Sequence, residues 1–501
     1  MTGQQSSYRQ IMKATTIFGG VQVFNILISI IRSKFVAVLL GPAGMGIMGL
    51  LTSTTGFIAS LTNFGLSTSA VKDIAAANSS EDQNRISTVV TIFRRLVWIT
   101  GLLGTLITLF FSSWLSLLTF GNTDYTYAFV CLSITLLLSQ LNSGQMVLLQ
   151  GMRQLKLLAK ADLAGSALGL FITLPLYYYY GKGGIVPGIV ASALLLLLLS
   201  LFYSRKIDIK PISVSSALTI SEGKGMLRMG FLISMSGLLS VGASYIVRVF
   251  IGRTGGVEQV GLYNAGFSII NTYVGLVFNA MATDYYPRLS AVAHDNSSCR
   301  QIVNQQAEIA LLILAPILVV FLVFINWVVV LLYSHKFVDV NVMIYWAALG
   351  MFFKAASWSV AFVFIAKGAS KLFFWSELAA NIYVLVFNLI GYYYWGLAGL
   401  GLSFVAAYLL YLIQVFFISK KMFDFSFDNS FRSIFTIQFS FAVAGFLAVS
   451  FFTPIYAYGV GIILISLSVW FSFRELEKRI GLIAGIKSFL HETRNNLDSF
   501  N

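Results

Sequence analysis

The stretch TTIFGGVQVFNILISIIRSKFVAVLL, Thr15 to Leu40, decides how the rest of the chain is interpreted. It is long enough to cross a bilayer, because a membrane-spanning helix needs about 20 predominantly apolar residues. It nevertheless carries Arg32 and Lys34 in its second half. A cation inside a spanning helix costs about 2.5–3.5 kcal/mol on insertion scales, so such residues rarely face lipid. We therefore expect both cations to face a polar cavity and to bind an anion there.

A second apolar segment follows this stretch closely. The residues Gly41-Pro42-Ala43-Gly44 predict a tight turn, after which the chain runs through apolar sequence as far as Lys72-Asp73. The two segments together form a hairpin of predicted spanning helices. The polar N-terminus and the absence of a cleavage site after a short apolar core predict that the first span stays as an anchor.

The overall composition is that of an integral membrane protein. Mean hydropathy is +0.83, with 57% hydrophobic and 10% charged residues, which excludes a soluble globular chain. The net charge of +14 resides mainly in short connections between apolar runs, which favours a role in membrane topology over nucleic-acid binding. Cys131 lies in a predicted span and Cys299 in a predicted loop, so no disulfide is expected.

Hydropathy predicts an all-α, polytopic fold with about fourteen transmembrane helices. The predicted spans are 15–40, 46–71, 88–112, 126–150, 161–180, 184–204, 229–252, 261–283, 307–332, 341–366, 372–395, 399–418, 433–453 and 456–473.

The distribution of basic residues predicts the orientation of these spans. With the N-terminus in the cytoplasm, only Lys182, Arg253 and Lys336 fall in outer connections, whereas most of the 33 basic residues fall in inner ones. This bias follows the positive-inside rule, so both termini are predicted to be cytoplasmic. The end of the chain, FRELEKRIGLIAGIKSFLHETR, is predicted to be either an amphipathic helix on the inner leaflet or an ordinary basic tail.

The chain also repeats itself at an interval of about 215 residues. Gly46-Ile47-Met48-Gly49 aligns with Gly261-Leu262-Tyr263-Asn264, and Tyr180-Gly181 aligns with Trp395-Gly396. Each copy holds six spans, so both insert with the same orientation around an axis along the membrane normal. We expect lobes at residues 1–210 and 211–425, a binding site between them, and an added helix pair with the tail at 426–501.

Catalytic and metal-binding patterns are missing from the sequence. The three histidines, His294, His335 and His491, are far apart and show no metal-ligand spacing. The predicted outer loops are also too short to hold a saccharide active site. We therefore expect neither an enzyme nor a cofactor, and the alternative of a membrane-embedded glycosyltransferase or polymerase lacks a catalytic face.

Four cations inside predicted spans are the sharpest polar signal: Arg32, Lys34, Arg248 and Lys354. Arg32 and Arg248 occupy nearly equivalent places in the two repeats. The alternative for Arg32, Lys34 and Arg248 is that their long stems carry the charge to the outer interface. Lys354 lies near the middle of its span, where this is difficult, so a cavity role is favoured.

The acidic and amide residues complete the candidate site. All nineteen acidic residues lie in loops or near a span end, which suits an anionic substrate; those nearest the membrane are the gating or ion-coupling candidates Asp162, Asp284, Glu308 and Glu377. The first two spans of each repeat carry Asn25, Asn63, Asn271 and Asn279. These amides can bond a neighbouring helix or the hydroxyls of a sugar, and the sequence leaves both roles open.

The segment from Gln22 to Leu66, with IIRSK at 30–34 and LLGPAGMGIMGL at 39–50, resembles the opening of bacterial O-antigen and polysaccharide flippases. These proteins belong to the multidrug/oligosaccharidyl-lipid/polysaccharide exporter superfamily. The resemblance implies two pseudo-symmetric six-helix lobes in a V around a central cationic cavity lined by helices one, two, seven and eight, and added helices thirteen and fourteen that form a lipid-facing groove in some members.

The resemblance also implies a function. The protein would move an undecaprenyl-diphosphate-linked oligosaccharide across the bacterial inner membrane by alternating access, as a monomer among membrane lipids, alongside the polysaccharide polymerase and chain-length machinery. The embedded cations would neutralise the diphosphate. The alternative is a cation-coupled multidrug antiporter of the same superfamily, but the chain lacks the carboxylate in helix one that is common in proton-coupled drug exporters.

Overall fold

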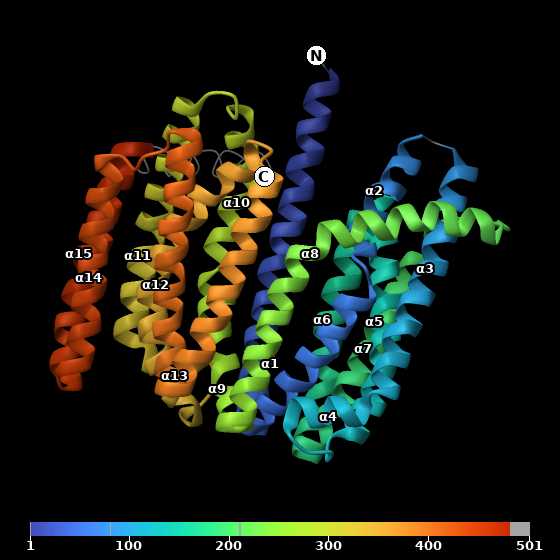
Figure 1. The fold of residues 1–501 in the computed structure, drawn as a ribbon, viewed down its shortest axis with the longest axis horizontal. Coiled ribbons are helices and arrows are strands. Elements are labelled where there is room, and N and C mark those ends of the chain that lie inside the picture. Colours follow the sequence, from blue (N-terminus) through green and yellow to red (C-terminus); the bar gives the residue numbers. More distant parts are fainter. Residues whose placement is uncertain (1, 81, 210–211, 481–501) are drawn as a thin grey trace, which may run out of the picture. The chain divides into compact units, whose positions relative to one another are not determined.

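The computed structural model describes the backbone of residues 2–80, 82–209 and 212–480 (Figure 1). Side chains are described over the same ranges except at 2–23, 232, 233, 236, 273, 276, 279, 280, 283 and 480. Within these ranges every regular element is a helix, as the hydropathy pattern predicted. The predicted amphipathic segment after residue 480 lies outside the described residues.

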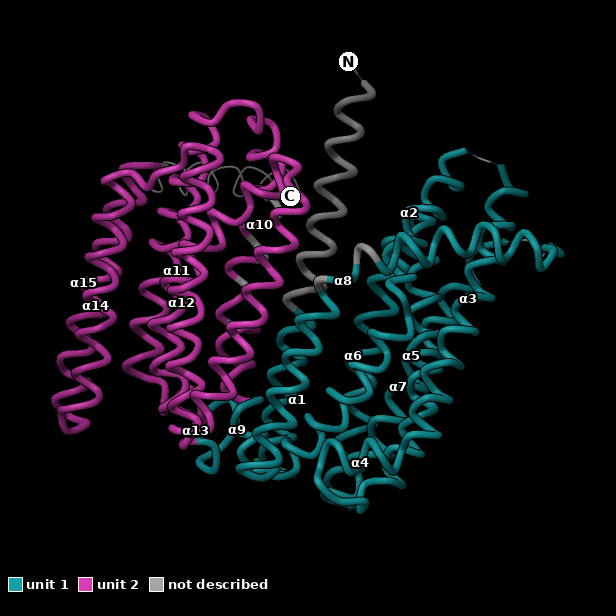
Figure 2. The backbone as a smooth tube through the Cα atoms, viewed as in Figure 1, with its two compact units in different colours: residues 1–264, 331–337 teal, residues 265–330, 338–501 magenta. Residues whose placement is uncertain are grey.

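The chain divides into two compact units (Figure 2). Unit 1 extends to Asn264 and includes Leu331–Phe337. Its helices are α1 (Thr2–Thr62), α2 (Leu66–Ser79), α3 (Gln83–Phe110), α4 (Ser112–Phe120), α5 (Thr126–Gly151), α6 (Leu155–Tyr180), the short 3₁₀ helix η1 (Gly181–Gly184), α7 (Ile185–Ser204), α8 (Ser216–Gly255) and most of α9 (Val257–Phe267).

Unit 2 contains Ala265–Val330 and Val338–Asn501. Its described elements are the π-helix η2 (Ser268–Val274), α10 (Leu276–Ala291), α11 (Asn296–Leu332), part of the 3₁₀ helix η3 (His335–Val340), α12 (Asn341–Ala366), α13 (Ser370–Phe423), α14 (Asn429–Phe451) and α15 (Pro454–Ile480). The division into 1–210, 211–425 and 426–501 stays a prediction.

The helices follow the predicted spans closely in places and differ in others. The span predicted at 341–366 coincides with α12, whereas the spans predicted at 372–395 and 399–418 are merged in α13. Among the described residues, nine helical stretches are long and apolar enough to cross a membrane, some of them long enough for two passes. The count of fourteen therefore stays a prediction. The predicted outer loop after residue 112 contains the short helix α4.

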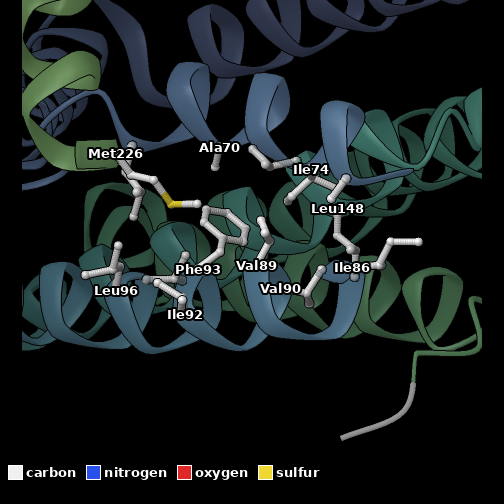
Figure 3. Close-up of a cluster of buried hydrophobic side chains, with 14 of the residues drawn as sticks. Ala70, Ile74, Ile86, Val89, Val90, Ile92, Phe93, Leu96, Leu148 and Met226 are labelled. Atoms are coloured by element: carbon white, nitrogen blue, oxygen red, sulfur yellow. The ribbon is translucent and has the colours of Figure 1, made fainter. Parts of the chain in front are cut away.

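Apolar packing at one end of unit 1 joins four helices. Ile74 of α2, Phe93 of α3, Leu148 of α5 and Met226 of α8 belong to one buried cluster (Figure 3). Burying side chains of this size stabilises the contact by about 1.5–3 kcal/mol each where the alternative is exposure to water. The cluster therefore anchors the first part of α8 on the helices of the first repeat.

The first hairpin differs in detail from the prediction. Its turn is reduced to one non-helical residue, Gly41, whose φ is 65°. This left-handed conformation is readily adopted by glycine because glycine has no Cβ atom. The second limb stops at Thr62, earlier than predicted, and the backbone N–H of Gly65 donates to Oδ1 of Asn63 at 2.6 Å before α2 begins.

Backbone geometry supports the internal repeat. Three pairs of residues with positive φ are separated by the interval found in the sequence: Gly41 (65°) with Gly256 (84°), Arg153 (55°) with Gly368 (69°), and Gly181 (55°) with Gly396 (56°). Each pair ends or breaks a helix at an equivalent place. The two pseudo-symmetric copies expected from sequence therefore bend at the same positions.

Candidate substrate-binding site

The first hairpins of the two repeats cross at a pair of equivalent glycines within unit 1. A Cβ atom on Gly46 would overlap the carbonyl oxygen of Val257, and one on Gly261 would overlap that of Pro42. The contacts are reciprocal, as a two-fold pseudo-symmetry axis between α1 and α9 would require. Only glycine allows the two backbones to approach so closely.

Hydroxyl groups hold α8 beside α1 and α4. The Thr54 and Thr119 hydroxyls are 3.2 Å apart, and that of Thr119 is 3.1 Å from the Tyr245 hydroxyl. The Tyr245 ring also stacks on Phe57, with centroids 5.3 Å apart. Because Tyr245 precedes Arg248 by about one helical turn, these contacts place the arginine beside the first hairpin.

Arg248 is held by neutral oxygen atoms. Its Nε donates to Oδ1 of Asn264 at 2.9 Å, and its Nη1 donates to the carbonyl oxygen of Ser244 at 3.1 Å. The guanidinium carbon lies 5.7 Å from the centre of the Tyr263 ring. These contacts orient the planar group.

Arg32 lies on α1 in a different environment. Its Nη2 is 3.2 Å from the position that a Cβ atom on Gly169 of α6 would occupy. Within the described part of the chain, Arg32 makes no hydrogen bond and no ion pair. Both Arg32 and Lys34 are partly buried.

Lys354 lies in unit 2 among aromatic rings. Its Nζ donates to Oδ1 of Asn271 at 2.8 Å and lies 5.1 Å, 5.7 Å and 5.9 Å from the ring centres of Tyr408, Phe404 and Phe278. Ring faces attract a cation through their quadrupole. Asn271 belongs to the π-helix η2, a local irregularity that is frequent at functional sites. No carboxylate pairs with Lys354 among the described side chains.

The four predicted asparagines have different surroundings. Nδ2 of Asn25 donates to Asp162 at 2.6 Å, which joins α1 to α6. Asn63 bonds the backbone at the break before α2, and Asn271 accepts from Lys354. The side chain of Asn279 lies outside the described residues. A role in sugar binding stays a prediction for all four.

Each of the remaining acidic candidates has a partner within the protein. Glu308 is buried on α11 and accepts from Nε of Arg479 at 2.8 Å, which ties the end of α15 to α11. Asp284 pairs with Arg288 one turn away at 3.0 Å and stays largely exposed. Glu377 accepts a hydrogen bond from the Tyr411 hydroxyl within α13. Their proposed roles in gating or ion coupling stay predictions.

The structure thus brings together some predicted residues and adds others. Asn271 and Lys354 meet, whereas Arg248 meets Asn264, which sequence reasoning did not select. The signal for Asn264 was present, because it replaces Gly49 in the aligned segments of the repeat. Among the described residues no group of three or more His, Cys, Asp or Glu side chains is placed to hold a metal ion.

Comparison with known proteins identifies the family. The model of a family described as polysaccharide biosynthesis protein matches residues 35–342, more than half of the chain. The chain belongs to this family. The match includes Arg248 and Asn264, and it begins just after Arg32 and Lys34 and ends before Lys354.

Individual relatives agree with the family. The lipid III flippase of Escherichia coli (strain K12) is 21% identical over 386 residues, covering 75% of this chain and 90% of the relative. The solved structure of the lipid II flippase MurJ in an inward closed conformation matches with a TM-score of 0.69 and 14% identity, over 93% of this chain and 99% of that one. An inward-facing multidrug resistance MATE family transporter matches with a TM-score of 0.65 and 18% identity, over 80% of this chain and 94% of the transporter.

The chain is thus a member of the polysaccharide biosynthesis protein family whose fold is similar to those of MurJ and of a MATE transporter of the MOP superfamily, which agrees with the resemblance seen in the sequence. The relatives are named as flippases and transporters, which agrees with the interpretation that the chain is not an enzyme. The predicted orientation of the termini stays a prediction.

Proposed function

We propose that the protein is a flippase for an undecaprenyl-diphosphate-linked oligosaccharide, the repeat unit of O-antigen or another surface polysaccharide. It would carry this molecule from the inner to the outer leaflet of the bacterial inner membrane by alternating access. The family match and the lipid III flippase relative support a lipid-linked substrate. The choice of glycan is part of the proposal.

The observation that carries the proposal is the chemistry around the embedded cations. Arg248 and Lys354 donate to amide and carbonyl oxygens, and Arg32 has no hydrogen-bond partner among the described residues. The hydrogen bond to Asn271 does not cancel the charge of Lys354, and Arg32 makes no ion pair within the described residues, so both of these charges are available to an anion. A diphosphate offers several acceptor oxygens, and charge-assisted hydrogen bonds to it are about twice as strong as neutral ones. We therefore assign diphosphate binding to Arg32, Arg248 and Lys354, with Lys34 as a fourth contact.

The test is complementation of a strain that lacks the gene. Arg32→Ala, Arg248→Ala and Lys354→Ala are compared with Lys182→Ala, an exposed lysine outside the proposed site. We expect Arg248→Ala to lower surface glycan at least about tenfold at equal membrane abundance, because a hydrogen bond to a charged group contributes roughly 1.5–3 kcal/mol. The lipid-linked unit should accumulate on the inner leaflet.

Unchanged surface glycan in all three variants would rule out the cationic site. The alternative function is a cation-coupled multidrug antiporter, which the likeness to the MATE fold keeps in consideration. Drug susceptibility of the same strain separates the two functions, because loss of a flippase removes surface glycan, whereas loss of an antiporter raises sensitivity to cationic drugs. Action as a monomer beside the polymerase and chain-length machinery remains part of the proposal.

A further inference from the structure

The side chain of Asn264 lies between Arg248 and Gly49. Its Oδ1 accepts the hydrogen bond from Nε of Arg248 at 2.9 Å. Its Nδ2 faces Gly49 of α1, where a Cβ atom would overlap it. Three helices, α1, α8 and α9, therefore meet at one amide group within unit 1.

The orientation of this amide is set by Arg248. An arginine nitrogen can only donate, so the oxygen of Asn264 must face it and the nitrogen must face Gly49. Nδ2 is buried there and has no hydrogen-bond partner in the described part of the chain. A buried donor without a partner costs free energy, and an apolar side chain at this position would avoid that cost. Stability alone therefore does not account for the asparagine.

Gly49 provides the space that this arrangement needs. The atom that a Cβ on residue 49 would meet first is Nδ2, the far end of the Asn264 side chain. A methyl group at residue 49 would push the amide away and break its contact with Arg248. Gly49 and Asn264 are also equivalent positions of the repeat, so the amide is present in the second copy only.

We propose that Asn264 is a positioning residue that orients Arg248 toward the substrate diphosphate. We also propose that residue 49 is a glycine because a side chain there would displace the Asn264 amide. This inference rests on the proposed function, in which Arg248 contacts the diphosphate. Neither residue touches the substrate in this scheme. Asn264 acts by fixing Nε of the Arg248 guanidinium, and Gly49 acts through Asn264.

The experiment measures binding of farnesyl diphosphate to the purified full-length protein by calorimetry. We expect Asn264→Ala and Gly49→Ala each to weaken binding about fivefold to tenfold, which is less than the loss of a direct hydrogen bond between a charged group and the ligand, because Arg248 itself remains. The double variant should be no weaker than Asn264→Ala alone, because the added methyl group then has no amide to displace. Such non-additivity is the signature of residues that act through one contact.

Two controls separate positioning from general damage. Gly56→Ala adds a methyl group to the same helix where no atom lies within 4 Å, and it should bind like the wild type. In an Arg248→Ala background, Asn264→Ala should cause no further loss. Asn264→Ser, which keeps an acceptor oxygen, should restore part of the binding, whereas a destabilised fold would show a lower melting temperature in every variant.

The outcomes distinguish this inference from the proposed function. If Arg248→Ala binds farnesyl diphosphate like the wild type, the assignment of the diphosphate to Arg248 is wrong, and the positioning role is wrong with it. If Arg248→Ala loses binding but Asn264→Ala does not, or if the losses from Gly49→Ala and Asn264→Ala add, only the positioning role is overturned.

Discussion

Arg32 and Arg248 occupy nearly the same place in two copies of one hairpin, yet their surroundings differ. Arg248 donates to Asn264 and to the carbonyl oxygen of Ser244. Arg32 lies against Gly169 and, within the described residues, makes no hydrogen bond. Within the described residues, hydrogen bonds orient the Arg248 guanidinium and none orients that of Arg32.

The difference shows how two equivalent arginines of a duplicated chain can take different roles in binding one substrate. The backbone breaks remain equivalent, at Gly41 in one copy and Gly256 in the other. The residue that contacts Arg248 in the second copy, Asn264, is not shared by the first copy, which has Gly49 at the equivalent position. A pre-oriented group loses less freedom when it binds a ligand, which favours specificity, whereas a less constrained cation contributes mainly its charge.

The largest expected effect comes from breaking the contact that the two hairpins share. Gly46→Ala would place a methyl group on the carbonyl oxygen of Val257, a backbone atom that has no rotamer to change. Overpacking of this kind costs about 1–3 kcal/mol, so we expect export to fall about fivefold to a hundredfold. Surface glycan per unit of membrane protein measures the export.

Gly56→Ala is the matched control for that variant, because its methyl group would meet no atom within 4 Å. It should export normally and should melt at or slightly above the wild-type temperature, since alanine favours the helix. Normal export by Gly46→Ala would show that the two hairpins do not need to approach closely.

A smaller effect should distinguish the two arginines directly. Arg248→Lys keeps the charge but cannot reproduce the hydrogen-bonding geometry at Asn264, so we expect about a tenfold loss of export. Arg32→Lys loses no protein hydrogen bond within the described structure and should stay within about twofold of the wild type. Export rates in the same deletion strain give both values, and equal losses would contradict the division of roles.

Much of the fold was predictable because membranes constrain sequence strongly. Helix length, apolar composition and the repeat interval predicted an all-α fold, and α12 coincides with its predicted span. The break at Asn63–Gly65 was not predicted, because no charged residue interrupts the sequence between residues 46 and 71, whereas the backbone turns at Phe64 and Gly65 with positive φ. Such a break depends on local backbone conformation, which hydropathy averaged over about 20 residues does not detect.

The candidate site was predictable in part for a similar reason. A charged residue in an apolar span is costly wherever it points, so Arg248 and Lys354 could be selected from sequence alone. Their partners could not. The rings of Phe404 and Tyr408 around Lys354 lie on α13, and aromatic residues are too common in this chain to single out two of them. Tertiary packing decides which ring meets the cation.

The smallest expected effect concerns Gly169, the neighbour of Arg32. A methyl group there would lie 3.2 Å from Nη2 of Arg32, so the guanidinium would have to shift by a few tenths of an ångström. Because no hydrogen bond of Arg32 is lost by this shift within the described structure, we expect export by Gly169→Ala to fall by about twofold or less.

Gly225→Ala on α8, where the added methyl group meets no atom within 4 Å, is the control for Gly169→Ala. Export assays of Gly169→Ala alone and combined with Arg32→Lys then show how the small loss arises. A loss that disappears in the combination acts through the shape of the guanidinium, since lysine has no Nη2 to displace. A tenfold loss from Gly169→Ala would mean that the orientation of Arg32 matters as much as that of Arg248. The two hairpins would then differ in their structure but not in how their arginines contribute to export.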